Sequence, residues 1–323
     1  MRTLSVSMML AGLAALAGCP GTDPAIPDAA PPDGSPADTT TDPGPIDAPP
    51  VTPICRHDAP FGPPQLVAEV STAGANEQSA WLSPDELTML FTRDAGGDGL
   101  AHVYLATRSS RQEPFGGVHP LLAISGTRDE YRAVMSPDLL TLYVDRRRGF
   151  GTGYAIYAAT RASRADAFGE LSEVAAVNDP HGQTWEPALS PGGSLYFAST
   201  RGASSDLFVA TRTGARFEAP VPLVELNSAD QEEAPVPSAD GLALYFATKH
   251  RGGADTSYDV WVALRPTTDS RFEVPSMVHG LNAIGDDLPS WISPDNCRLY
   301  FTSDRGGSGI TADDIWVASR QPQ

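Results

Sequence analysis

Acidic residues recur at one fixed distance before a turn in five segments of this chain. The position six residues before each turn serine is occupied, in chain order, by Glu77, Glu130, Thr184, Glu232 and Asp287. Four carboxylates brought to one place could bind a cation, a basic peptide or a polar ligand, and paired acids can carry hydrolysis. The alternative is structural, because a repeated position usually meets a repeated need, such as pairing with backbone donors or arginines. The sequence leaves both interpretations open, and the four acids are its candidate binding residues.

Two sets of arginines recur with the same period. One set lies in Gly-rich loops: Arg93, Arg146, Arg201, Arg251 and Arg305. The other set closes an apolar strand in each segment: Arg108, Arg161, Arg212, Arg265 and Arg320. Three segments also carry an aspartate at the start of that strand: Asp206, Asp259 and Asp314. Since a guanidinium can bind a carboxylate through two charged hydrogen bonds, we expect these arginines to be structural ties.

No residue cluster indicates catalysis. The six histidines do not recur with the repeat, and none has a partner at zinc-ligand spacing. The chain has no nucleophile-elbow motif and no phosphate-binding loop. We therefore predict no catalytic residue and no cofactor, and the sequence gives no basis for assigning a metal. The net charge of −18 argues against a nucleic-acid partner, because nucleic acids reward basic patches.

The elements that must position these residues are strands. Five turns are alike: Ser83-Pro84-Asp85, Ser136-Pro137-Asp138, Ser190-Pro191-Gly192, Ser238-Ala239-Asp240 and Ser293-Pro294-Asp295. Each turn follows a short apolar strand and precedes an apolar aromatic strand such as Leu299-Tyr300-Phe301. A third strand comes next, and a weaker fourth begins at a phenylalanine: Phe61, Phe115, Phe168, Phe217 or Phe272. A period of about 50 residues with several strands in each unit is typical of a β-propeller.

The two chain ends predict how the ring closes. The chain stops after the last third strand, yet its first strand, at Phe61, is a fourth strand with no partners before it. The strands match only if that N-terminal strand completes the C-terminal blade, which leaves no open sheet edge between the ends. The sequence therefore predicts an all-β fold, a five-bladed β-propeller over residues 55–323.

The repeat resembles the WD-type propeller repeat of TolB-like proteins. The resemblance rests on Ser-Pro-Asp before a Leu-Tyr-Phe strand, an Arg-Gly-Gly loop, and a closing strand such as Asp314-Ile315-Trp316-Val317-Ala318. Individual copies depart from it, with Gly192 and Ala239 in the turns and His102 and Ala155 at the start of the third strand. TolB has six blades and an added N-terminal domain that nothing here matches, so a role in the Tol system is not implied.

The first 54 residues are distinct from the repeats. Residues 1–19 combine Arg2 with a short apolar run and end in Leu16-Ala17-Gly18-Cys19, which resembles the lipobox of bacterial lipoproteins and implies cleavage before Cys19 and its lipidation. A plain secretory signal is the alternative. Residues 20–54 are rich in Pro and Asp and lack aromatics, so we expect a disordered stalk.

With Cys19 lipidated, two cysteines remain. Cys55 precedes the first strand and Cys297 lies in the last turn, so ring closure brings both into one blade. An exported compartment permits oxidation, and we predict a disulfide between them, with two free thiols as the alternative.

Together these features predict a lipoprotein anchored in the cell envelope, at the outer membrane. Its propeller would be a binding or scaffolding module for an envelope protein, peptide or glycan, touching the membrane only through its anchor. The alternative is a glycosidase-like hydrolase acting at the acidic mouth of the propeller channel. Such an enzyme should contain acids that do not follow the repeat.

Overall fold

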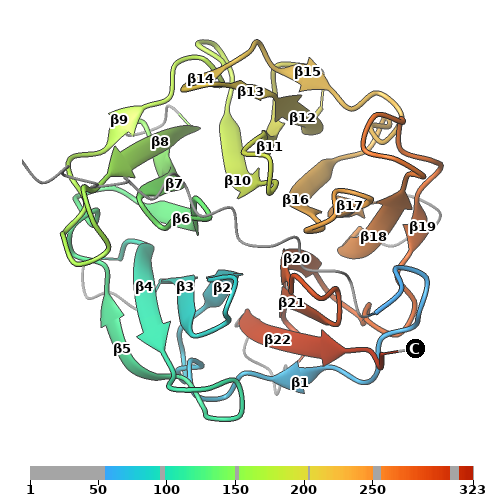
Figure 1. The fold of residues 1–323 in the computed structure, drawn as a ribbon, viewed down its shortest axis with the longest axis horizontal. Helices are drawn as coiled ribbons and strands as arrows, with labels where there is room; N and C mark the ends of the chain where they lie inside the picture. Colours follow the sequence, from blue (N-terminus) through green and yellow to red (C-terminus); the bar gives the residue numbers. More distant parts are fainter. Residues whose placement is uncertain are drawn as a thin grey trace, which may run out of the picture. The chain divides into compact units, whose positions relative to one another are not determined.

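The computed structural model shows a five-bladed β-propeller (Figure 1). It describes residues 55–94, 99–149, 153–202, 204–249, 256–305 and 313–322. The leader, the stalk, Cys19 and Arg251 lie outside the described residues. The described part of the chain contains no helix long and apolar enough to cross a membrane. The all-β, five-bladed prediction is confirmed.

Every blade is a four-stranded antiparallel sheet. The inner strands of blades one to five are β2 (Glu77–Leu82), β6 (Glu130–Met135), β10 (Thr184–Leu189), β16 (Glu232–Pro237) and β20 (Asp287–Ile292). The second strands are β3 (Thr88–Arg93), β7 (Thr141–Arg147), β11 (Leu195–Ser199), β17 (Ala243–Lys249) and β21 (Arg298–Ser303). The third strands are β4 (His102–Thr107), β8 (Tyr154–Thr160), β12 (Asp206–Ala210), β18 (Tyr258–Leu264) and β22 (Asp314–Ser319). The outer strands are β5 (Gly116–Pro120), β9 (Ser172–Glu173), β15 (Val221–Pro222), β19 (Ser276–Met277) and β1 (Gln65–Leu66), and a small hairpin of β13 (Arg212–Thr213) and β14 (Arg216–Phe217) extends blade three.

The repeated turn is held by its serine. In four blades the serine hydroxyl donates to the turn aspartate, as in Ser83 Oγ to Asp85 at 2.5 Å, and accepts the N–H that opens the second strand, as from Thr88 at 3.0 Å. These bonds satisfy backbone groups that a two-strand turn leaves unpaired. Blade three carries Gly192 in place of the aspartate and keeps only the bond from Ser194 N to Ser190 Oγ, at 3.1 Å.

An arginine after each third strand ties that strand to the outer part of its blade. Its guanidinium stacks on the phenylalanine that precedes the outer strand, and the distances to the ring centre are 4.3 Å for Arg108 on Phe115, 4.5 Å for Arg161 on Phe168, 5.9 Å for Arg212 on Phe217, 4.6 Å for Arg265 on Phe272 and 4.3 Å for Arg320 on Phe61. Four of the five also donate Nε to a carbonyl in the turn after the inner strand, as Arg108 does to Glu86 at 2.7 Å. The outer strands themselves are short and start beyond these phenylalanines, and in blade three the added hairpin contains Phe217. The arginines expected to be structural ties therefore have that role here, through aromatic rings and carbonyls.

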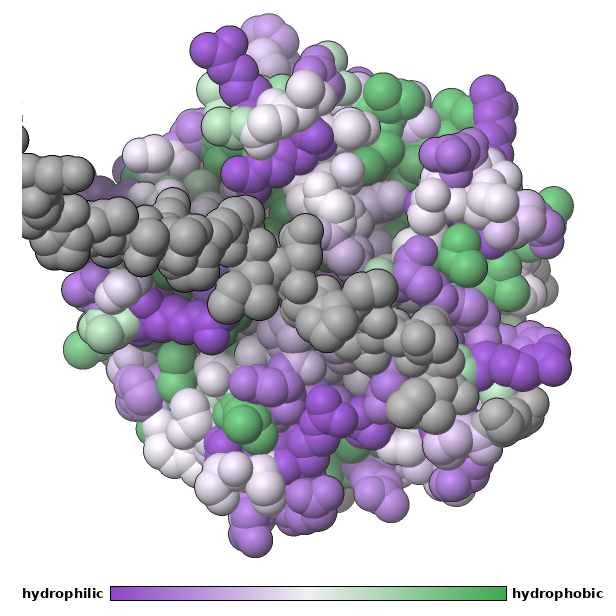
Figure 2. Space-filling model, in the orientation of Figure 1, coloured by the Kyte–Doolittle hydropathy of each residue, from purple (hydrophilic) through white to green (hydrophobic). Residues whose placement is uncertain are grey.

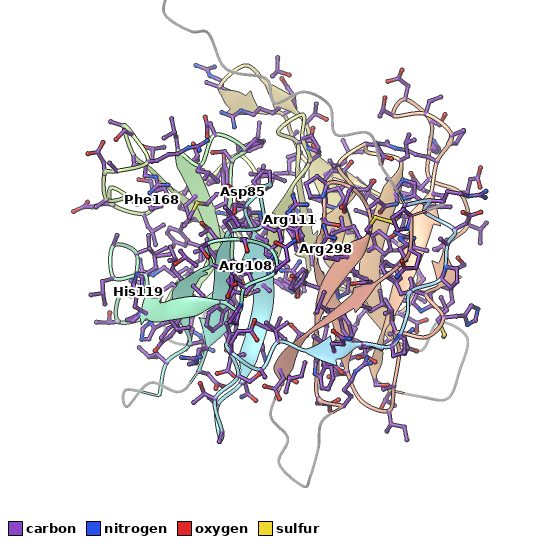
Figure 3. All side chains as sticks on the ribbon, turned by 60° about the horizontal axis from the view of Figure 1, so that its bottom comes forward. Asp85, Arg108, Arg111, His119, Phe168 and Arg298 are labelled. Atoms are coloured by element: carbon purple, nitrogen blue, oxygen red, sulfur yellow. A yellow bond between two sulfur atoms is a disulfide. The ribbon has the colours of Figure 1, made fainter. Side chains whose placement is uncertain are left out.

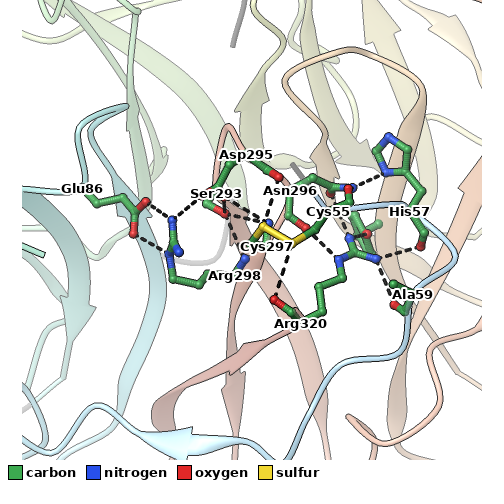
Figure 4. The surroundings of a disulfide bond; sticks show 11 residues. Cys55, His57, Ala59, Glu86, Ser293, Asp295, Asn296, Cys297, Arg298 and Arg320 are labelled. Carbon is green, nitrogen blue, oxygen red and sulfur yellow. Dashed lines mark hydrogen bonds and ion pairs between the residues drawn. A yellow bond between two sulfur atoms is a disulfide. The ribbon is translucent and has the colours of Figure 1, made fainter. Parts of the chain in front are cut away.

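Blade five contains both ends of the described chain. Strand β1 pairs with β22, so the first strand completes the last blade as predicted. A disulfide joins Cys55 to Cys297, with Cα atoms 5.2 Å apart (Figure 4). Arg320, only 3% exposed, donates to the carbonyls of His57 at 2.8 Å and Ala59 at 3.1 Å. The N-terminal segment is thus held by a strand pair, a covalent bond and a buried arginine.

A buried carboxylate links blade five to blade one. Glu86, fully buried in the turn of blade one, accepts Arg298 Nε at 2.8 Å from β21. Arg108 and Arg111 of blade one approach the same carboxylate at 3.6 and 3.5 Å. Figure 3 shows the three arginines converging where the two blades meet. A buried carboxylate is destabilising unless it is paired, and the arginines around Glu86 provide that pairing.

The disulfide can be tested directly. Denatured, non-reduced Cys19→Ser protein should show no reactive thiol, because the two remaining cysteines are bonded to each other. Replacing both Cys55 and Cys297 by serine should lower the free energy of unfolding by about 2–5 kcal/mol, since the bridge restrains a long loop of the unfolded chain. Thiol titration and chemical denaturation measure the two effects. Two titratable thiols in the Cys19→Ser protein would contradict the bridge.

Candidate ligand site at the propeller axis

The repeated acids lie at the start of the inner strands, where they hold the preceding loops. Glu77, Glu130, Glu232 and Asp287 are fully buried. Glu232 accepts the N–H of Ser228 at 3.0 Å, and Asp287 accepts that of Ala283 at 2.7 Å. Thr184 does the same with its hydroxyl, which accepts the N–H of Asp179 at 3.2 Å. The role shared by Glu77, Thr184, Glu232 and Asp287 is to cap the loop that enters the blade.

Arginines of the second strands and following loops complete this arrangement. Arg93 Nε lies 2.7 Å from Glu77, Arg146 Nε 3.0 Å from Glu130, and Arg305 Nη2 2.5 Å from Asp287. The acids that these three arginines reach are the repeated inner-strand acids, not the aspartates that start the third strands. Burial raises the pKa of Glu77 and Glu130 against the lowering effect of their partners. Of the two interpretations that the sequence leaves open for these acids, the geometry favours the structural one.

A cavity of about 210 Å³ lies beside these acids at the hub, where the inner strands converge (Figure 1). None of the four repeated acids lines it. Its wall is formed by Gln78, Ser79, Arg132, Glu186, Tyr258, Asp286, Leu288, Thr302 and Asp313. Six of these nine residues lie one or two places after a repeated position or one place before it. The expected place on the chain was therefore close, but the side chains that reach the cavity are different ones.

A bulge in each inner strand explains this offset. The pairing of each inner strand with its neighbour shifts register near the middle, as between Gln78 and Trp81 or between Trp185 and Ala188. Ser79 and Glu186 adopt positive φ angles of 58° and 54° there. A bulge redirects the side chains next to it. The repeated acid therefore remains buried while the residue two places later reaches the cavity.

Arg132 is the most unusual residue of the wall. It is 2% exposed and donates Nη2 to the carbonyl of Pro289 at 2.7 Å, across the hub on β20. Its Nε has no hydrogen-bond partner, and no carboxylate of the described residues forms an ion pair with it. Burial lowers the pKa of Arg132, which the charges of Glu186 and Asp145 oppose. A buried guanidinium with a free donor is costly unless something completes its bonding.

Two buried carboxyls face this arginine from neighbouring strands. Burial raises the pKa of Asp145 on β7 to about 7 and that of Glu186 on β10 to about 8, although the positive charge of Arg132 lowers both pKa values. The surface that Glu186 exposes faces the cavity, and one of its oxygens accepts the N–H of Ala234 at 2.5 Å. Burial also raises the pKa of the adjacent Glu233. Carboxyls that hold protons near neutral pH in a cavity are typical of functional sites.

The sequence carried a signal for these residues that the repeat obscured. Two places after the repeated acid the five copies have Ser79, Arg132, Glu186, Ala234 and Pro289. Ionisable side chains occur there in only two copies, which marks them as exceptions to the repeat. Asp145 is similarly an exception, because its counterparts in the other second strands are threonine or alanine.

Known proteins that are similar to this chain are found among solved structures. No protein-family model and no curated protein matches the chain. Among solved structures, it is similar to a putative TolB from Agrobacterium tumefaciens (15% identity, 74% of this chain and 76% of that one, TM-score 0.47) and to TolB from Acinetobacter baumannii (14%, 79% and 56%, TM-score 0.48). It is also similar to a putative glycoside hydrolase from Parabacteroides distasonis (12%, 82% and 94%, TM-score 0.49).

The raised pKa values predict a pH dependence of stability. A carboxyl whose folded pKa lies above its unfolded pKa binds more protons in the folded state, so stability should fall as pH rises from about 4 to 8. Asp145 and Glu186, at about 7 and 8, should together account for a loss on the order of a few kcal/mol. Denaturation curves of wild type and of an Asp145→Asn/Glu186→Gln variant at several pH values measure this loss. The variant should show a flatter profile, whereas Glu218→Gln, at an exposed position, should follow wild type. Parallel profiles for all three proteins would contradict the assignment.

Proposed function

We propose that this chain is an envelope lipoprotein whose propeller binds a ligand in the axial cavity. The observation that carries the proposal is Arg132, a buried arginine in the cavity wall with one donor unused. Elsewhere in the described part of the chain, the buried acids and arginines of the repeats are paired with one another or with the backbone. The cavity is where polar groups that no repeat requires come together, which is the usual mark of a binding site.

The anchor and the location belong to the same proposal. Cys19 in its lipobox-like context would carry the lipid, and residues 20–54 would hold the propeller away from the membrane. The disulfide between Cys55 and Cys297 supports export, because such bonds persist in oxidising compartments. The location that we propose for the anchored protein is the outer membrane.

The size and polarity of the cavity narrow the partner. The partner could be an envelope protein, a peptide or a glycan. Because the cavity has a volume of only about 210 Å³, it fits a partner that inserts a small polar group. Figure 2 shows hydrophilic residues over much of one face, with hydrophobic ones only in separate spots. The coloured part of that face therefore offers no broad apolar surface for recognition.

A hydrolase is the second candidate, and Glu186 is the reason. A carboxyl with a pKa of about 8 keeps its proton at neutral pH and could act as a general acid, while Glu233 lies close enough for its charge to raise that pKa further. Such non-repeating acids are what a two-carboxylate mechanism requires. Turnover of aryl glycosides by wild type, lost in Glu186→Gln, would favour this function over binding alone.

A cavity-filling variant tests the binding site. We expect the full chain, purified in detergent and incubated with small molecules from envelope extracts, to retain polar ligands that mass spectrometry detects. Leu288→Trp, which fills the cavity from its wall, should abolish retention, whereas Val274→Trp, at a position 92% exposed on the surface, should not. If folded Leu288→Trp protein retains the same ligands as wild type, the axial cavity is not the binding site.

A further inference from the structure

The cavity wall has opposite charges contributed by different blades. Arg132 comes from β6 in blade two, and Asp286 and Asp313 come from blade five, immediately before β20 and β22. Blades two and five are not neighbours in the ring (Figure 1), so the two signs of charge reach the cavity from separate blades. Opposite charges that line one cavity without forming an ion pair leave both available to a ligand.

The arginine requires an acceptor. Two of its donors are used by the carbonyls of Pro289 and Pro235, at 2.7 and 3.5 Å, and Nε is unused. Since both protein acceptors are neutral, the positive charge itself is not matched by any direct contact. A carboxylate on the ligand would supply both the acceptor and the countercharge.

The acids of blade five lack a cationic partner, although Asp286 accepts the N–H of Tyr258 at 2.8 Å and Asp313 accepts a hydrogen bond from Gln78. Asp286, Asp304 and Asp313 lie close enough to affect one another, and burial, reinforced by these like charges, raises the pKa of Asp304 and Asp313. No arginine or lysine of the described residues forms an ion pair with any of the three, and Asp304 Oδ1 is buried without a partner. The described residues contain no group of three side chains placed to hold a metal ion. A larger cation with several donors, such as an ammonium group, therefore fits better than a metal.

The strand between the two charges sets their separation. Arg132 binds the carbonyl of Pro289, three residues along the extended chain from Asp286. At about 3.3 Å for each residue of a strand, these levels are roughly 10 Å apart. A ligand that reaches both must have its two charged groups separated by several bonds.

We propose that the axial cavity binds a small zwitterion of the ω-amino-acid type, with its carboxylate on Arg132 and its ammonium group on Asp286 and Asp313. This proposal rests on the axial cavity being the binding site and adds the chemical class of the ligand. Gln78, which donates to Asp313 from blade one, holds that carboxylate in the wall.

A series of probes tests it by calorimetry on the full chain in detergent. The probes are glycine, β-alanine, 4-aminobutanoate and 6-aminohexanoate, with butanoate, butylammonium and glycerol as single-charge and neutral controls. The longer amino acids should bind at least about tenfold tighter than glycine and than either single-charge control, because only they engage both ends of the cavity. Equal affinity across the series, or tighter binding of glycerol, would overturn the proposal.

Variants assign the two ends. Arg132→Met should reduce affinity for the longer amino acids to that of butylammonium, and Asp313→Asn should reduce it toward that of butanoate, while Glu218→Gln leaves it unchanged. If Arg132→Met fails to fold, Asp313→Asn and the probe series on wild type decide the question. A further outcome is that wild type binds glycerol or a single-charge control as well as it binds the amino acids, and that Leu288→Trp abolishes this binding. That outcome would reject the zwitterion but keep the cavity as the binding site. Tight binding of the amino acids that Leu288→Trp does not affect would reject both.

Discussion

The pairing of β1 with β22 is the constraint on which the rest of the structure depends. It joins the start of the propeller to its end, and the Cys55–Cys297 bridge and Arg320 hold it in place. Blade five also supplies Pro289, the acceptor of Arg132, and the acids Asp286 and Asp313. Without closure, one side of the axial cavity would have no fixed position, so the same contacts that complete the ring also form the site.

Within this ring, the residues that recur from copy to copy stabilise the fold, and the residues that differ between copies form the site. The repeated acids and arginines cap loops, stack on phenylalanines and bind turn carbonyls, and they do so in nearly every blade. Arg132, Glu186 and Asp145 are unlike their counterparts in the other copies, and the backbone contacts of Arg132 and Glu186 reach other blades and do not recur. Their buried charges reduce stability unless compensated, which makes them poor candidates for a purely structural role.

Much of the architecture could be predicted from the sequence. The turn serines and aromatic strands depend on local interactions, and the first strand without neighbours in sequence depends on how the ring closes. The number of blades, the closing strand and the pairing of Cys55 with Cys297 follow from that order. The cavity could not be predicted in the same way. Alternation along a strand places Glu77 and Ser79 on one face, but the bulge after Gln78 breaks that alternation and separates a buried acid from a cavity residue. The burial of Glu186 is likewise set by several blades at once.

The most direct test of this account is the titration of carboxyl groups by carbon-13 NMR in protein labelled at glutamate side chains. If Glu186 is a buried, functional carboxyl at the axis, one glutamate signal should titrate near pH 8 and disappear in Glu186→Gln. If the Glu186 signal titrates near pH 4 to 5, as solvated glutamates do, the hub is an ordinary solvated channel and the assignment of the site to it is wrong.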